Sequence, residues 1–83
     1  MKIYDLSHKL NNLTPVYPGN NPPEFTQIAD FKSHGYRETQ FRFHSHLGTH
    51  IDAPAHMIDN GNTLDQLPAE HFCGNALIIK TLI

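Results

Sequence analysis

The sequence predicts an α/β fold in which a strand-rich core is flanked by short helical segments. Three features indicate this class: an alternating run over 37–47, an apolar run at 76–79, and a helix-start signal at Thr63. Because the chain has 83 residues, we expect a single domain over 1–83. A chain of this size buries only about 60% of its unfolded surface, so its stability is marginal.

The first third of the chain predicts strands separated by a proline-rich loop. Apolar and polar side chains alternate over 2–8, which is typical of a short half-buried strand. Residues 10–25 hold four prolines and a glycine, so they predict a loop. Residues 24–31 predict a second strand, and residues 33–36 predict a turn.

The remaining elements follow from alternation, a cap and a terminal apolar run. Residues 37–47 predict a strand with Phe41 and Phe43 on one face. Thr63 and Gln66 have the spacing of a capping box, which predicts a short helical turn. The run GNALIIKTLI, residues 74–83, predicts a strand that is buried on both faces and needs neighbouring strands.

The composition argues against several functional classes. The formal net charge is −2, from 6 Lys and Arg and 8 Asp and Glu, and the two signs are scattered along the chain. We therefore expect no nucleic-acid partner. No apolar run has the length of a signal peptide or membrane span, so we expect no membrane partner and a cytoplasmic location. Cys73 is the only cysteine, which excludes an internal disulfide.

The stretch HSHLGTHIDAPAHM, residues 44–57, places four histidines and one aspartate close together. Four residues of straight strand span about 13 Å, whereas two nitrogens bound to one zinc lie within about 4 Å. A straight strand therefore cannot bring His46 and His50 to one metal. A helix would bring them together but would turn Asp52 away, and Pro54 opposes its continuation.

Gly48 offers a third geometry for this stretch. Glycine adopts positive φ or carries a bulge, so the chain can fold back until His46, His50 and Asp52 converge. Two imidazoles and a carboxylate suit zinc, manganese or iron(II), and they leave coordination positions open as in a catalytic site. His56 lies past the bend, as a further ligand or a general acid/base. The simpler alternative is that these histidines are surface or hydrogen-bonded residues.

The segment HLGTHIDAPAH, residues 46–56, resembles the HxGTHxDAPxH signature of the cyclase-like metal-dependent hydrolases. That family includes bacterial kynurenine formamidases (arylformamidases) and isatin hydrolases. Further similar segments occur in the family's order: DLSHKL, TPVYPGNNP, GNTLDQLP and CGNALII. The resemblance implies the swivelling β/β/α fold of these hydrolases, of which residues 1–83 would be a truncated N-terminal part.

The resemblance also implies roles for individual residues. His46, His50 and Asp52 match the ligands of the first divalent metal, zinc or manganese, with Asp52 bridging to a second ion where two are bound. His56 matches the proton donor and acceptor. Tyr17 stands where kynurenine formamidases carry a tryptophan that packs on the aromatic substrate, although a loop aromatic can also simply pack against its own domain.

These roles lead to an expected activity and an alternative. The expected activity is hydrolysis of a small amide or lactam, at a C–N bond other than a peptide bond, by metal-activated water with His56 moving the proton. The resemblance implies a homo-oligomer, and a further histidine and a glutamate or glutamine supplied from beyond residue 83. The alternative is a metal-binding or oligomerisation fragment without catalysis, in which the 74–83 strand pairs with a copy of itself.

Overall fold

The computed structural model describes residues 1–81. Its elements, in chain order, are β1 (Glu24–Ala29), α1 (Phe31–His34), β2 (Glu38–Arg42) and the 3₁₀ turns η1 (Pro54–His56), η2 (Leu64–Gln66) and η3 (Ala69–Phe72). The chain divides into two compact units, Met1–Ile51 and Asp52–Ile83. The first unit contains both strands and α1, and the second contains the three 3₁₀ turns.

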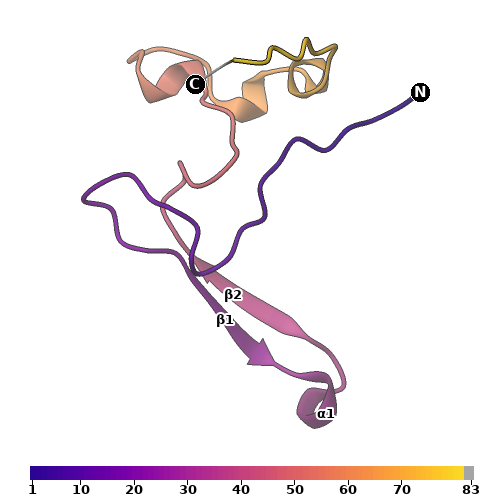
Figure 1. Ribbon diagram of the computed structural model, residues 1–83. Coiled ribbons are helices and arrows are strands. Elements are labelled where there is room, and N and C mark those ends of the chain that lie inside the picture. The colour runs from indigo at the N-terminus through magenta and orange to yellow at the C-terminus, as the bar shows by residue number, and fades with distance from the viewer. Residues whose placement is uncertain (82–83) are drawn as a thin grey trace. The chain divides into compact units, whose positions relative to one another are not determined.

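The first unit is organised around an antiparallel hairpin of β1 and β2, with α1 at its tip (Figure 1). Phe25 lies opposite Phe41, and the register shifts between Gln27 and Ala29. The rings of Phe25 and Phe41 meet edge to face at 5.2 Å between centroids, and Phe43 lies 5.9 Å from Phe25. Such contacts between aromatic residues stabilise the pairing of the strands. The predicted strand over 24–31 is confirmed for its first six residues.

The turn predicted at 33–36 is confirmed as the end of a single helical turn. Asp30 caps α1 through its side chain, which accepts a hydrogen bond from the Ser33 N–H at 2.7 Å. Gly35 ends it in the left-handed conformation, with φ of 77° and its N–H donated to the Phe31 carbonyl. The cap and the glycine together explain why the chain reverses here.

The strand predicted over 37–47 is shorter than expected, because β2 ends at Arg42. Its partner β1 begins at Glu24, which lies opposite Arg42, and the two residues before Glu24 are Pro22 and Pro23. Proline has no N–H to donate to a neighbouring strand, so the ladder stops at that point. Residues 43–47 are consequently available to leave the sheet and enter the histidine stretch.

Two other strand predictions are wrong for the residues that the structure describes. Residues 2–8 form no strand, and neither do residues 74–81, while residues 82–83 of the second prediction lie outside the described part. A strand exists only when its backbone groups pair with another strand, and neither segment has such a neighbour within 1–81. The side-chain patterns of residues 2–8 and 74–81 suit a strand, but within residues 1–81 neither segment pairs with another strand.

The helical turn predicted from Thr63 is confirmed as η2. The Thr63 N–H donates to Oε1 of Gln66 at 3.0 Å, which is the glutamine half of the predicted capping box. Over the described residues the molecule is therefore a β-rich piece with two antiparallel strands and short helical turns. The swivelling β/β/α fold and the single domain over 1–83 remain predictions.

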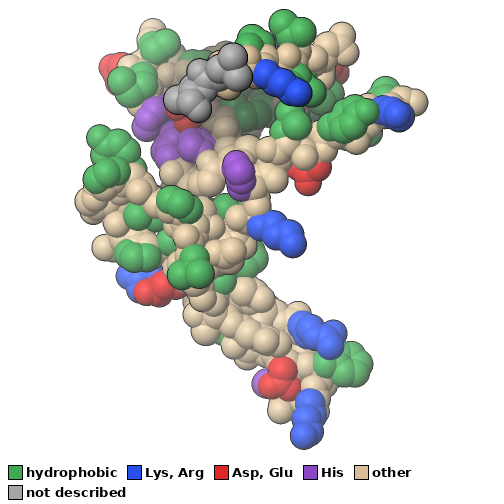
Figure 2. Space-filling model, in the orientation of Figure 1, with side chains coloured by type: hydrophobic (Ala, Val, Ile, Leu, Met, Phe, Trp, Pro, Cys, Tyr) green, Lys and Arg blue, Asp and Glu red, His purple; other side chains and the backbone are tan. Residues whose placement is uncertain are grey.

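Little apolar surface is buried within the part of the chain described. Among the hydrophobic side chains there, Ala29 and Leu47 form the buried core, each 4% exposed. Hydrophobic side chains are distributed over the visible face in Figure 2, and Ile78 is 86% exposed. Over residues 1–81, no helix has the length and hydropathy needed to cross a bilayer.

Candidate metal centre

Gly48 bends the chain between the two central histidines. Its φ is 58°, in the left-handed region that glycine adopts without strain. A Cβ at this position would lie 2.6 Å from Cδ2 of Leu10, so the N-terminal segment packs directly against the glycine. The His8 N–H also donates to Oγ1 of Thr49 at 3.0 Å. The bend expected from the sequence is confirmed, and contacts from residues 8–10 hold it.

The bend brings together the three predicted metal ligands, His46, His50 and Asp52. Each offers one ligand atom, and these atoms all lie within 4.8 Å of one another. Nδ1 of His46 is 3.1 Å from Nε2 of His50. Two nitrogens on a tetrahedral zinc are about 3.3 Å apart, given zinc–nitrogen distances of 2.0–2.1 Å. The spacing of the two imidazoles therefore suits a shared cation.

A hydrogen bond to the backbone orients the His50 ring. Nδ1 of His50 lies 2.7 Å from the carbonyl oxygen of Gly48. Because a carbonyl only accepts, Nδ1 carries the proton and Nε2 presents its lone pair on the side of His46. Metal-binding histidines are commonly held in this way by a carbonyl on the other ring nitrogen. Gly48 thus supplies both the bend and the acceptor that fixes the tautomer of His50.

The donor set fits a divalent cation. Two neutral imidazoles and one carboxylate are ligands that zinc, manganese and iron(II) accept. His46 is half-buried, whereas His50 and Asp52 are exposed, so the cluster is open to solvent on one side. A three-ligand set leaves coordination positions for water or substrate, as in catalytic rather than structural sites. The chemistry of the cluster is compatible with a divalent metal and does not select one.

A cavity of about 650 Å³ within the first unit places Tyr17 and His46 on the same lining. Its remaining lining residues are His8, Lys9, Asn11, Leu13, Thr14, Pro15 and Gly48. Tyr17 is 75% exposed, which argues against the alternative that this ring only packs against its own domain. The cavity thus joins the residue expected to contact substrate to one of the expected metal ligands.

His56 ends the η1 turn in the second unit. The turn closes through a hydrogen bond from the His56 N–H to the Ala53 carbonyl at 2.9 Å. Gly61 supports the turn from the side, since a Cβ there would lie 2.7 Å from the backbone carbon of Pro54. The Ala55 N–H donates to the Asn62 carbonyl at 3.0 Å. Asn60-Gly61 is a common turn dipeptide, but nothing in the sequence indicates that this turn packs against residues 54–55.

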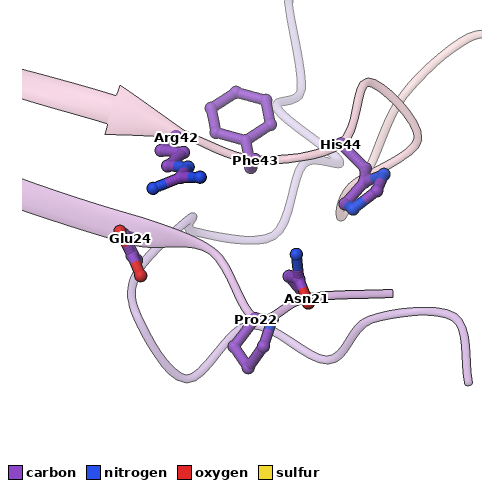
Figure 3. Close-up of a pocket in the computed structure, with 6 residues that line it drawn as sticks. All are labelled: Asn21, Pro22, Glu24, Arg42, Phe43 and His44. Carbon is purple, nitrogen blue, oxygen red and sulfur yellow. The ribbon is translucent and has the colours of Figure 1, made fainter. Parts of the chain in front are cut away.

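The fourth histidine of the stretch, His44, lines a different cavity of the first unit (Figure 3). This cavity has a volume of about 470 Å³, and its lining residues are Asn21, Pro22, Glu24, Arg42, Phe43 and His44. His44 is not a member of the His46, His50 and Asp52 group, in agreement with its position outside the signature. No feature of the sequence predicted this second cavity.

Comparison with known families places the chain among the cyclases. The family described as "Putative cyclase" matches residues 4–82, so the chain belongs to this family. The matched range includes both cavities and every predicted ligand. Membership of a cyclase-like family, suggested by the HLGTHIDAPAH signature, is therefore confirmed.

Individual relatives are named as kynurenine formamidases. The chain is 31% identical to "Kynurenine formamidase" of Salinibacter ruber over 81 residues, covering 95% of this chain and 38% of the relative. It is 33% identical to the protein of the same name from Geobacillus thermodenitrificans over 76 residues, covering 90% of this chain and 36% of the relative. The chain thus spans less than two fifths of these relatives. No solved structure matches it.

Proposed function

We propose that this chain carries the metal centre of a hydrolase that cleaves a small amide or lactam, with an aryl formamide as the preferred type. The observation that carries the proposal is the convergence of ligand atoms from His46, His50 and Asp52 within 4.8 Å. The names of the relatives support hydrolysis of a non-peptide C–N bond. The proposed cofactor is a divalent metal, zinc or manganese.

His46, His50 and Asp52 would hold the cation. The Gly48 carbonyl keeps Nε2 of His50 as the ligand atom, and the Asp52 carboxylate adds the negative charge that offsets the cation. When bound, a divalent metal polarises a carbonyl and lowers the pKa of a bound water.

His56 and Tyr17 would supply the remaining chemistry. His56 accepts a proton from the attacking water and returns it to the leaving nitrogen, so that the C–N bond breaks and a carboxylic acid and an amine form. Tyr17 offers its exposed ring as a face on which an aromatic substrate packs, beside His46 in the same cavity. We further propose a cytoplasmic homo-oligomer that acts on small molecules and has neither nucleic-acid nor membrane partners.

The test combines metal binding with turnover. The purified chain is titrated with Zn²⁺ and Mn²⁺ by calorimetry, and hydrolysis of formanilide, isatin and N-formylkynurenine is then followed with and without metal. We expect about one bound ion that the His50→Ala variant loses, because truncation of one of three ligands removes much of the binding free energy. The His56→Ala variant should bind metal and lose turnover, and His71→Ala should change neither. Absence of both metal binding and metal-dependent turnover would overturn the proposal.

A second candidate is a metal-binding or oligomerisation module without catalysis. The exposure of Leu77, Ile78 and Ile79, each 75% or more, favours it, since such a run is suited to pairing with another chain. A stable dimer by light scattering that binds metal and cleaves none of the three substrates would favour this candidate.

A further inference from the structure

We propose that Lys9 makes the cavity beside His46 selective for aryl amides that carry a negative charge, in preference to neutral amides or lactams. The inference rests on the proposed function only in taking this cavity as the substrate site. It adds the substrate's charge and a residue that recognises it.

The charges that line the cavity are of one sign. Lys9 supplies a positive charge to the lining, and none of the nine lining residues is an aspartate or a glutamate. A lysine ammonium carries a full positive charge and three donors, so it binds a carboxylate as a compact point charge. A concave surface lined by one sign of charge attracts ligands of the opposite sign. The lining therefore favours an anionic ligand.

The same lining also offers a surface for an aromatic ring. Leu13, Pro15 and Tyr17 contribute apolar and aromatic side chains, whereas His46 brings the metal cluster to the cavity. A substrate with a ring, an amide and an acidic group would contact all three parts of the lining. A neutral lactam would leave Lys9 without a counter-charge. The arrangement thus distinguishes two substrate types that the signature alone leaves open.

Hydrogen bonds fix the loop that forms one wall of the cavity. The Leu13 N–H donates to Oδ1 of Asn11 at 2.8 Å, and the Asn11 N–H donates to Oγ1 of Thr14 at 2.9 Å. Oδ1 of Asn12 accepts from the Phe25 N–H at 2.7 Å, which ties the loop to β1. On the other side of Lys9, the His8 N–H is bound to Thr49 and Leu10 packs on Gly48. The backbone on both sides of Lys9 is therefore anchored to the metal-binding bend.

The test compares two probes that differ by one carboxylate, formanilide and N-formylanthranilate. Each is titrated into the ¹⁵N-labelled 83-residue chain in EDTA, and dissociation constants are taken from amide chemical shifts. We expect the carboxylate probe to bind about twofold to fivefold more tightly, the range of an ion pair with an exposed lysine. The Lys9→Gln variant should lose this preference, and Lys9→Arg should keep it. Lys32→Gln removes the same charge on α1, away from the cavity lining, and should behave as the wild type.

The outcomes separate this inference from the proposed function. Three results would overturn the role of Lys9. The two probes bind equally well, the preference survives in Lys9→Gln, or neither probe binds, whether or not the amide spectrum of the chain is dispersed. Metal-dependent hydrolysis of both probes at equal efficiency would also contradict it, while leaving the proposed hydrolase standing. A Lys9-dependent preference without turnover in Zn²⁺ or Mn²⁺ would support the anion site and overturn the hydrolase.

Discussion

Gly48 has three roles at the candidate metal centre: it adopts positive φ, it makes room for Leu10, and its carbonyl orients His50. The sequence alone indicates the first role, because glycine between two candidate ligands predicts a bend. The other two depend on a segment about forty residues away and on the ring position of His50. At this residue the sequence predicts the conformation, and only the structure shows its contacts.

We expect Gly48→Ala to destabilise the chain and weaken metal binding together. A non-glycine residue in the left-handed region costs about 1–2 kcal/mol, and the added Cβ must also displace Cδ2 of Leu10. Gly35→Ala is the matched control, because Gly35 has φ of 77° and nothing within 4 Å of its Cβ position. Denaturant titration should show a loss of stability for both variants, whereas calorimetry should show weaker metal binding for Gly48→Ala alone. Equal metal affinity in the two variants would contradict the role of the bend.

The Asp5 carboxyl gives a prediction about pH. The backbone N–H of Ser7 donates to Oδ1 of Asp5 at 2.9 Å and, with the Ser7 side chain, holds the pKa of this carboxyl below its ordinary value of 3.8. A lowered folded-state pKa stabilises the fold above the ordinary value, and this contribution is lost as the pH falls through the folded-state pKa. The Ser7→Pro variant lacks the N–H, so an NMR titration should find its Asp5 pKa higher than in the wild type. An unchanged Asp5 pKa would contradict the local turn.

At the level of elements, the length of a strand depends on its partner. The alternation over 37–47 predicted a long strand, but β2 ends at Arg42, where β1 begins after two prolines. Period-2 alternation reports which side chains can share a face and contains no information on how far the partner extends. The capping box at Thr63 was predictable because its hydrogen bonds join residues three apart. Local elements were thus predicted more reliably than paired ones.

The η1 turn that carries His56 is supported by the turn around Gly61. In the Gly61→Ala variant the new Cβ would meet backbone atoms of Pro54 and Ala55 at 2.7–2.9 Å, which cannot rotate away. We expect a loss of about 1–3 kcal/mol in stability, with amide shifts at residues 54–56 and lower turnover. Gly74→Ala is the control, since nothing lies within 4 Å of its Cβ position. If Gly61→Ala matched Gly74→Ala in stability and spectra, the proposed support of η1 would be wrong.

Across residues 1–81 as a whole, the main feature is the amount of apolar surface that is exposed. Ala29 and Leu47 form the buried hydrophobic core of the described residues, whereas Ile3, Leu13 and Leu77 are each at least 84% exposed. The chain also spans less than two fifths of the relatives compared above. Exposed apolar surface of this kind is suited to contact with another polypeptide.

We expect the chain by itself to associate with copies of itself and to bind an apolar dye. Its weight-average mass in light scattering should rise with concentration, and anilinonaphthalene sulfonate should fluoresce strongly in its presence. The Ile78→Lys variant, which places a charge within the exposed run, should reduce both effects, and Thr81→Lys should reduce them less. A monomeric, dye-negative wild-type chain at all concentrations would contradict this expectation.

The family, the three candidate ligands and the need for a bend at Gly48 follow from the sequence alone, because all of these depend on residues within one short stretch. The three-dimensional contacts were needed to show that Leu10 and Thr49 fix the bend, that Tyr17 shares a cavity with His46, and that Gly61 supports η1. They also show where β2 ends and that residues 2–8 form no strand. The two kinds of feature differ in how far apart along the chain the interacting residues lie. Side-chain type and local spacing act over a few residues, whereas strand pairing and cavity formation join segments whose separation along the chain has no signature in composition or periodicity.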